Sequence, residues 1–325
     1  MTPDWYHGRP ILVLGGLGFI GVNLSRRLVA LGARVTVMTP DQSAHAREAA
    51  DLASSGAAVV DADIRDADSM RRLVREQNVV FHLSGRSGAV RSTEDPFTDL
   101  DVNGRGSLVL LEALKAENRQ AHLVFVGSRL EYGRVGAEPV GEDRPADPLC
   151  PHAVHKLLVE HYLRLYGRLF GVKSIVARVT NPFGPGQPSA RTDYGVVNRM
   201  IHLALRDRTL TVYGDGRQRR DYVFIDDAVE ALLRLGERAT ADAPVYNVGT
   251  GIGTSLVDIA REITAVAGGG RVEFVEWPAL AQQIETGDFV ADISRIRNEV
   301  GWAPAVRLRD GLVRTVSFYR AHALP

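Results

Sequence analysis

Two side chains that can exchange protons lie one helical turn apart near the middle of the chain. His152 and Lys156 belong to the segment Pro151–Phe170, whose first proline and apolar spacing predict a helix. Their four-residue spacing puts both on one face of that helix, with His155 close by. A neutral imidazole accepts a proton near neutral pH, and a neighbouring ammonium group favours the neutral form. The pair is therefore a candidate site for general base catalysis, in which His155 could share the task.

A glycine-rich turn near the N-terminus is suited to an anion. The apolar run 11–14 is typical of a strand covered on both faces, and helical periodicity begins directly after the turn. Glycines at three-residue spacing leave no side chain between a pyrophosphate and the helix N-terminus, whose free amides favour the anion. The residues predicted to hold a dinucleotide here are Gly15, Gly18, Phe19, Ile20 and Gly21.

Alternating apolar runs and helical patterns predict the framework that positions these groups. Further strands are expected at 34–38, 57–60, 79–83, 123–126 and 174–179, and one more at 244–251 that ends in glycine. This alternation predicts an α/β fold with a Rossmann-type doubly wound parallel sheet. It loosens after residue 179, and the breaker-rich stretch 180–186 is expected to be a loop. We therefore expect a Rossmann domain at 1–178 plus about 220–250, and a smaller, discontinuous C-terminal substrate lobe at 179–219 plus about 251–325.

The carboxyl ends of the predicted strands supply the remaining candidates for cofactor binding, because open α/β sheets bind ligands at that edge. The place of a ribose-binding acid holds Thr39, with Asp41 two residues further on, and the nearest arginine for a 2′-phosphate is Arg47. NAD is therefore favoured over NADP. The other predicted cofactor contacts are Asp63, Ile64, Leu83, Ser84 and Gly85, together with Lys156.

Composition narrows the class of protein. The 325 residues carry a formal net charge of zero, which argues against nucleic acid or an acidic membrane surface as a partner. The single Cys150 cannot form an internal disulfide, which fits a reducing cytoplasm. No apolar segment approaches the length of a membrane span, and no cluster with metal-ligand spacing is evident, so we expect a cytoplasmic protein without a metal site.

Several ordered motifs together resemble the extended short-chain dehydrogenase/reductase family, and within it the nucleotide-sugar epimerases and dehydratases. They are Gly15-Gly16-x-Gly18-x-x-Gly21, Ser128 with Tyr132-Gly133, Lys156, Arg178-x-x-Asn181-Pro182-Phe183-Gly184-Pro185 and Gly214-Asp215-Gly216-x-Gln218-x-Arg220-Asp221. The resemblance implies NAD as cofactor and a nucleoside-diphosphate sugar as substrate. It also implies a homodimer formed through the predicted helices at 96–117 and 151–170.

The resemblance also assigns roles to individual residues. It implies that Ser128 orients the substrate oxygen and that Lys156 holds the nicotinamide ribose. The proton-exchanging tyrosine of the family falls on His152, so this chain has an imidazole where the family has a phenol. The implied substrate contacts are Ser128, Asn181 and Arg220 with Arg217 for the diphosphate, Val212 for the base, and Asp288.

Two departures from the family bear on the reaction. The family's 4,6-dehydratases carry Asp-Glu directly after the catalytic hydroxyl residue, whereas this chain has Arg129-Leu130, with Glu131 one residue out of register. A dehydratase is therefore disfavoured. Where the family often has a phosphate-binding arginine before Gly287-Asp288, this chain has Glu285-Thr286. The leading prediction is an NAD-dependent epimerase acting through a transient keto sugar, most simply at C4. A 4-ketoreductase, or a catalytically weak nucleotide-sugar-binding or regulatory protein, is the alternative.

Overall fold

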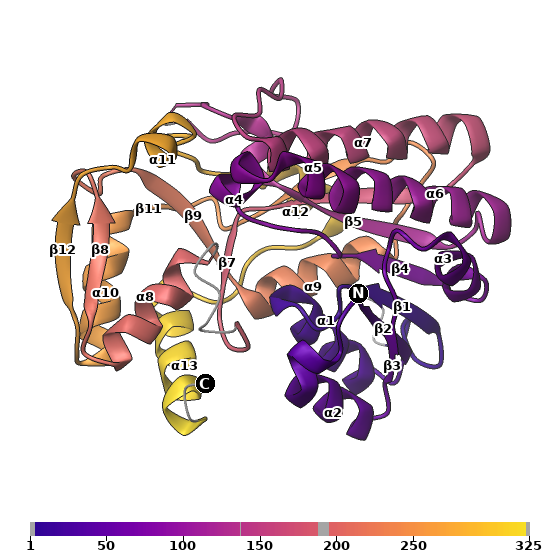
Figure 1. The fold of residues 1–325 in the computed structure, drawn as a ribbon, viewed down its shortest axis with the longest axis horizontal. Helices are drawn as coiled ribbons and strands as arrows, with labels where there is room; N and C mark the ends of the chain where they lie inside the picture. The colour runs from indigo at the N-terminus through magenta and orange to yellow at the C-terminus, as the bar shows by residue number, and fades with distance from the viewer. Residues whose placement is uncertain (1–3, 137, 188–194, 323–325) are drawn as a thin grey trace.

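The computed structural model describes residues 4–136, 138–187 and 195–322, and a parallel sheet of seven strands forms the centre of its larger part (Figure 1). The strands follow one another across the sheet in the order β10-β6-β5-β4-β1-β2-β3, and every neighbouring pair is parallel. The chain thus winds outward in two directions from the boundary between β1 and β4, which confirms the predicted doubly wound fold. The strands are β1 Pro10–Leu14, β2 Arg34–Thr39, β3 Ala58–Asp61, β4 Val79–His82, β5 His122–Ser128, β6 Ser174–Val179 and β10 Val245–Val248.

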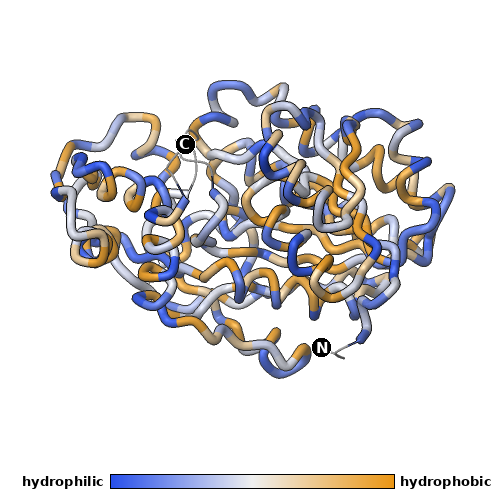
Figure 2. Tube along the Cα trace, turned by 90° about the horizontal axis from the view of Figure 1, so that it is seen from below, coloured by the Kyte–Doolittle hydropathy of each residue, from blue (hydrophilic) through white to orange (hydrophobic). Residues whose placement is uncertain are grey.

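Helices cover both faces of this sheet (Figure 1). Successive side chains of a strand point to opposite faces, so Ile11 and Val13 of β1 pack in one core and Leu12 and Leu14 in another. In Figure 2 the strands at the centre of the larger part are hydrophobic along most of their length. Such two-sided burial explains why the strands read as unbroken apolar runs. One face carries α1 Phe19–Ala30 and α9 Ile225–Gly236, and the other carries α3 Ala67–Val74, α6 Gly106–Glu117 and α7 Pro151–Phe170.

The helix predicted at 96–117 is continuous over these bounds, but its middle is π-helical. After α4 Ala89–Glu94, the chain runs through α5 Pro96–Asp99, a π-helical turn η2 Leu100–Arg105, and α6. The π turn packs closely on α7, because a Cβ added at Gly104 would lie 3.3 Å from Cδ2 of Leu158. Local π geometry of this kind is frequent at functional sites. The predicted helix at 151–170 is confirmed with the same bounds.

A smaller part lies beside the carboxyl edge of the large sheet (Figure 1). Its three-stranded sheet joins β7 Asn181–Phe183, β9 Arg219–Phe224 and β11 Gly253–Ser255, and a second sheet pairs β8 Thr209–Tyr213 with β12 Arg271–Val275. The loop expected at 180–186 is therefore wrong in part, since Asn181–Phe183 pairs in parallel with β9. Between β9 and β11 the chain returns to the large sheet as β10, so separated segments build the smaller part. Its helices are α8 Val196–Leu205, α10 Leu256–Ala267, α11 Ala279–Gln283 and α13 Leu308–Ala321, and α12 Ser294–Val300 lies near β10.

Within the described residues, every helix is too short or too polar to cross a lipid bilayer.

Candidate active site

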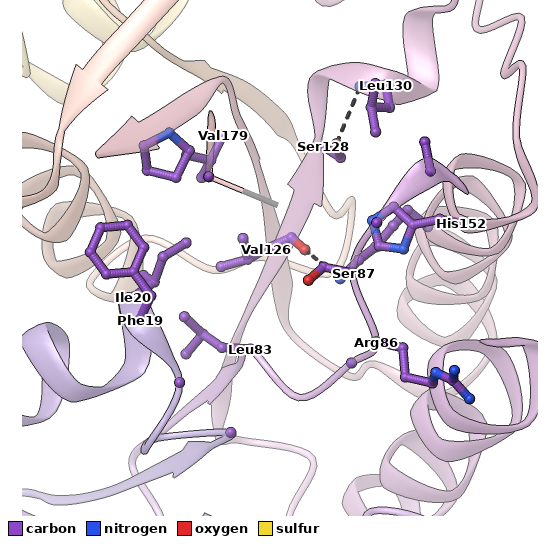
Figure 3. Close-up of a pocket in the computed structure, with 18 of the residues that line it drawn as sticks. Phe19, Ile20, Leu83, Arg86, Ser87, Val126, Ser128, Leu130, His152 and Val179 are labelled. Carbon is purple, nitrogen blue, oxygen red and sulfur yellow. Dashed lines mark hydrogen bonds between the residues drawn. The ribbon is translucent and has the colours of Figure 1, made fainter. Parts of the chain in front are cut away.

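A cavity of about 880 Å³ opens at the carboxyl ends of the central strands (Figure 3). Such a position follows from the topology, because the loops after β1 and β4 leave in opposite directions at the point where the winding reverses. The cavity brings together sixteen of the predicted site residues. They are Gly15, Gly18, Phe19, Ile20, Gly21, Thr39, Asp41, Asp63, Ile64, Leu83, Ser84, Gly85, Ser128, His152, Lys156 and Asn181.

The glycines of the first turn form a backbone cradle that side chains would fill. Gly15 has a φ of +74°, and a Cβ there would lie 2.8 Å from the backbone nitrogen of Ser84. A Cβ at Gly21 would lie 2.3 Å from the backbone oxygen of Gly15, so the helix could not pack this closely on the turn. Gly18 caps α1, whose first turn carries no acidic residue. The helix N-terminus is thus open to a pyrophosphate, and this cradle fits a dinucleotide.

Acidic side chains lie where the adenosine end of a dinucleotide is expected. The exposed carboxylate of Asp41 accepts hydrogen bonds from Ser43 Oγ at 2.6 Å and from Ala44 N at 3.0 Å, and these bonds lower its pKa. Asp63 accepts two hydrogen bonds from the guanidinium of Arg65, at 2.9 and 2.6 Å. Arg65 also donates to Asp101 at 2.7 Å. Although Arg65 lines the cavity, its charge is already balanced by two carboxylates.

His152 extends from the start of α7 into the cavity (Figure 3), and its surroundings assign its tautomer. Its Nδ1 lies 3.8 Å from Oδ2 of Asp99 and 3.4 Å from Nδ2 of Asn103. Both amide hydrogens of Asn103 have nearer acceptors, the backbone oxygen of Arg86 at 3.0 Å and Asp99 Oδ1 at 2.9 Å. The carboxylate of Asp99 lies beyond hydrogen-bond distance from Nδ1, and its negative charge favours a hydrogen on Nδ1 with Nε2 as the proton acceptor.

Asp99 serves a second imidazole as well. Its Oδ1 accepts a hydrogen bond from Nδ1 of His155 at 2.6 Å. His155 is not among the residues that line the cavity, so the geometry favours His152 over His155 as the base. Burial acts to raise the pKa of Asp99, but hydrogen bonds with His152 and His155 outweigh it and lower that pKa to about 2. Asp99 is thus a fixed negative charge behind His152.

Lys156 and Ser128 lie beside the imidazole. Nζ of Lys156 donates to the backbone oxygen of Val126 at 2.9 Å and lies 4.7 Å from the centroid of the Phe125 ring. Burial lowers the pKa of Lys156 to about 8. Burial also lowers the pKa of His152, and the Lys156 charge adds to this effect while Asp99 opposes it. The lowered pKa of His152 favours a neutral imidazole. The ammonium group of Lys156 is weakened as a cation by burial, but a pKa of about 8 still leaves it mostly charged near pH 7.

Glu131 lies away from the cavity, as its register predicts. Ser128 caps the short helix η3 Arg129–Tyr132, in which the carboxylate of Glu131 accepts from Ser128 N at 2.6 Å. Burial and the neighbouring Glu160 raise the pKa of Glu131, against the opposing effect of Arg178, whose Nε lies 3.3 Å from Glu131 Oε2. Leu130, by contrast, lines the cavity. The turn after Ser128 therefore offers the cavity no carboxylate.

The other predicted substrate contacts do not line this cavity. Val212 is fully buried in the core, because β8 places it between the sheet and its helices. The side chain of Arg217 is 86% exposed and lies 3.5 Å from Asp215. Arg220 donates to Glu285 and to the backbone oxygen of Gly287, and Asp288 accepts from Arg219 at 2.8 and 2.9 Å. Substrate contact by these four residues stays a prediction, and none of them lines the cavity.

Sequence patterns did not single out three groups that the structure brings to the site. Asp99 and Asn103 lie behind His152, and the guanidinium of Arg129 lines the cavity next to Ser128. Arg129 stands where the resemblance implies an acid in 4,6-dehydratases. This difference in the sequence pointed to a position on the cavity wall. Asp99 carried no comparable signal, because an acid in a helical segment is ordinarily a solvated residue.

A doubly wound sheet with a glycine cradle and a Ser-His-Lys set at one edge defines a dinucleotide-dependent enzyme. The model of the NAD dependent epimerase/dehydratase family matches residues 11–249. A UDP-glucose 4-epimerase of Mycolicibacterium smegmatis is 34% identical over 313 residues, which cover 95% of this chain and 98% of that protein. The chain belongs to the NAD dependent epimerase/dehydratase family, which confirms the predicted family and NAD as its cofactor.

Solved structures agree with this assignment. The UDP-glucose 4-epimerase of Thermotoga maritima with UDP-glucose has a TM-score of 0.87 and 29% identity, with 96% of this chain and 99% of that chain covered. The UDP-glucose 4-epimerase of Thermus thermophilus in complex with NAD has a TM-score of 0.86 and 30% identity, with 97% and 100% covered. The predictions of an extended dehydrogenase/reductase fold and of an NAD-dependent epimerase are confirmed as a class.

Proposed function

We propose that this protein epimerises a nucleoside-diphosphate sugar at C4 through a transient keto sugar, with His152 as the base. The observation that carries this proposal is the placement of His152, whose Nδ1 faces Asp99 and whose ring lies in the cavity beside Ser128 and Lys156. UDP-glucose 4-epimerases among the relatives support the substrate class and the carbon atom. NAD, when bound, supplies a hydride acceptor that returns the hydride to the other face of the sugar.

In this mechanism each residue acts on a specific atom. Nε2 of His152 accepts the proton of the sugar hydroxyl, and Asp99 stabilises the imidazolium that forms. The hydroxyl of Ser128 orients the same sugar oxygen. Lys156, held by the Val126 carbonyl, binds the nicotinamide ribose and keeps the imidazole neutral until the proton is transferred. Asn181 lines the cavity on the substrate side.

There are three alternatives to epimerisation: a dehydratase, a ketoreductase and a protein that binds the nucleotide sugar without turnover. A 4,6-dehydratase needs an acid and a base beyond the catalytic hydroxyl, but Leu130 stands on the cavity wall there and Glu131 is buried away from the cavity. A 4-ketoreductase would use the same His152 and Lys156 but would consume reduced cofactor. A binding or regulatory protein would keep the pocket without turnover.

We also propose that the protein is a cytoplasmic homodimer. Apolar side chains on α5 and α7 are exposed in the single chain, with Phe97 83% and Leu169 62% exposed. Val159 of α7 points the other way and is buried in the core. A second copy of α5 and α7 would cover the exposed side chains, because burial of apolar surface drives association.

The experiment that tests the proposed function supplies NAD and a nucleotide sugar and measures both products. UDP-glucose, UDP-N-acetylglucosamine and dTDP-glucose are incubated with the NAD-loaded protein, and the sugar is analysed by proton NMR. We expect the C4 epimer to form with no net change in reduced nicotinamide. Net formation of NADH together with a keto sugar would identify a ketoreductase running in reverse instead. Tight binding with unchanged sugar would identify a binding protein.

A further inference from the structure

Arg129 brings a guanidinium group into the substrate side of the cavity. It follows Ser128 directly and lines the cavity wall. Its Nε donates to Oδ1 of Asn181 at 3.2 Å, and its Nη1 donates to Oγ1 of Thr286 at 2.9 Å. Both acceptors are neutral. Among the residues that the structure describes, no carboxylate forms an ion pair with Arg129.

Neighbouring arginines differ from Arg129 in this respect. Arg65 lines the same cavity and is paired with Asp63 and Asp101. Arg86 also lines the cavity, and its Nη1 lies 2.9 Å from the carboxylate of Asp95. Arg220, behind the wall, is paired with Glu285. Arg65, Arg86 and Arg220 are thus paired with carboxylates, whereas Arg129 is held by an amide and a hydroxyl. Arg199 also lines the cavity, and no carboxylate among the described residues forms an ion pair with it.

The electrostatics of Arg129 indicate a charge that lacks a partner. Burial, followed by repulsion from Arg220, lowers its pKa to about 9, although Glu285 acts in the opposite direction. A guanidinium removed from water without an anion is unfavourable, and its planar fork matches a carboxylate or phosphate group with two parallel hydrogen bonds. Binding such an anion would relieve the unfavourable charge.

The position of Thr286 adds a second reason. By resemblance, an arginine that binds phosphate is expected just before Gly287-Asp288, and this chain has Thr286 there. Arg129 reaches Thr286 from the end of β5, 157 residues earlier in the chain. The guanidinium of Arg129, at the end of β5, therefore places a positive charge next to position 286, where the expected arginine is missing.

We propose that Arg129 is an oxyanion-binding residue of the substrate cavity and that its ligand is an oxyanion of the nucleotide sugar. This inference rests on the proposed function, because it assumes that a nucleotide sugar enters this cavity. Two parts of such a ligand carry this chemistry: the diphosphate, and a carboxylate on the sugar of a uronic acid. Asn181 and Thr286 hold the guanidinium so that its remaining N–H groups meet the ligand.

Calorimetric titration of the NAD-loaded protein tests the proposal without requiring turnover. The ligands are UDP, dTDP, UDP-glucose and UDP-glucuronate, and the variants are Arg129→Gln, Arg129→Lys and Thr286→Val. We expect Arg129→Gln to weaken binding by about 10- to 100-fold, because hydrogen bonds to charged groups are the stronger kind. Arg129→Lys keeps the charge but loses the fork, so it should lie in between. Arg75→Gln, an exposed arginine paired with Glu117, serves as the matched control.

The pattern across ligands identifies the source of the oxyanion. An equal loss for all four ligands assigns Arg129 to the diphosphate, and a loss confined to UDP-glucuronate assigns it to the sugar carboxylate. Unchanged affinity for every ligand in Arg129→Gln would overturn the proposal. The melting temperature of Arg129→Gln without nucleotide checks the fold, and we expect it to equal or exceed that of the wild type because an unpaired charge is removed.

Should Arg129→Gln fail to fold, Arg129→Lys and Thr286→Val still decide the question. Both should weaken the same ligands by at least about threefold, a change near the lower end of a hydrogen bond's contribution. Wild-type affinity in both variants would overturn the proposal. A wild-type protein that binds none of the four ligands would instead contradict the proposed function, and the two failures are therefore distinguishable.

Discussion

Nδ1 of His152 lies 3.8 Å from the carboxylate of Asp99, whose other oxygen is bonded to His155 at 2.6 Å. The buried carboxylate thus stands behind the imidazole, where it opposes the lowering of the His152 pKa by burial and by Lys156. A phenol would need its pKa lowered by several units to act as a base near pH 7, whereas an imidazole needs no such shift. The resemblance implies a tyrosine at the position of His152, and in this chain a carboxylate lies behind the imidazole that stands there.

Replacing His152 tests the base directly. We expect His152→Ala to lower kcat by about 100-fold or more, which is the usual contribution of a general base. The affinity for the nucleotide sugar should stay close to that of the wild type, because the contacts of its phosphate and base lie elsewhere. His161→Ala, an exposed histidine on the same helix, is the matched control. Full activity of His152→Ala would rule out this residue as the base.

His152→Tyr restores the residue that the resemblance implies, and partial activity is expected where the cavity admits the longer ring.

The pH dependence of kcat/KM reports the two titrating groups of the free enzyme. Burial and Lys156 lower the pKa of His152, so we expect the acid limb below pH 6.5, the ordinary value for histidine. Activity should fall as pH drops through that pKa, because imidazolium cannot accept a proton. Lys156, with a pKa of about 8, should give an alkaline limb near that pH. The charged or titratable groups around His152 are Asp99, His155, Lys156 and Cys150. An acid limb above pH 7 would contradict the expected direction of the shift.

Asp99→Asn separates a positioning role from a merely structural one. The carboxylate raises the pKa of His152 against the effect of burial, so its removal should move the acid limb of kcat/KM to lower pH. An asparagine amide can also donate to Nδ1 and favour the wrong tautomer, so kcat should fall by about 10- to 1000-fold. Asp99→Glu keeps the charge and should recover part of the activity, and Glu94→Gln on the exposed face of α4 serves as control. Lower activity with an unmoved acid limb would show that Asp99 only supports the fold.

Cofactor discrimination should depend on Asp41. Its exposed carboxylate lies at the end of β2 on the cavity wall, where it favours ribose hydroxyls and repels a 2′-phosphate. We expect NAD to bind more tightly than NADP, and Asp41→Ala to narrow the difference. Titration calorimetry with both cofactors measures this, with Asp68→Ala, an exposed acid on α3, as control. Tighter binding of NADP by the wild type would refute the prediction.

The proposed dimer predicts an effect of charges placed on α5 and α7. We expect Phe97→Glu combined with Leu169→Glu to give a monomer in sedimentation velocity, because charged side chains at the centre of an apolar interface are left without partners. Ile252→Glu is the control, since Ile252 is also apolar and 67% exposed but precedes β11 in the smaller part. A wild-type protein that stays monomeric at micromolar concentration would count against the dimer.

The fold was predictable from sequence wherever burial is continuous along an element. Ser174–Val179 is covered on both faces and was expected with the same bounds. The π turn Leu100–Arg105 was not expected, because the periodicity of a single wide turn differs too little from that of an α-helix. Asn181–Phe183 becomes a strand through its pairing with β9, forty residues further along the chain, which outweighs the local preference of its proline for a loop.

The site was predictable only where one motif contains the chemistry. Gly15, Gly18 and Gly21 form such a motif, and the cavity contains all three. The contact between Arg129 and Thr286, and the one between Asp99 and His155, join residues far apart in sequence. Periodicity and spacing carry no information about such contacts, because they depend on how separate elements pack together.

The π turn between α5 and α6 also sets how the site tolerates insertions and deletions. An α-helix advances about 100° per residue, so losing one residue from a regular α-helix would turn the side chains before the loss by that angle relative to those after it. The wider ring of a π turn already holds an additional residue, so the loss of one residue within 100–105 would let this segment close to a regular α-helix. We therefore expect the segment to accept a one-residue deletion while Asp99 keeps its place behind His152.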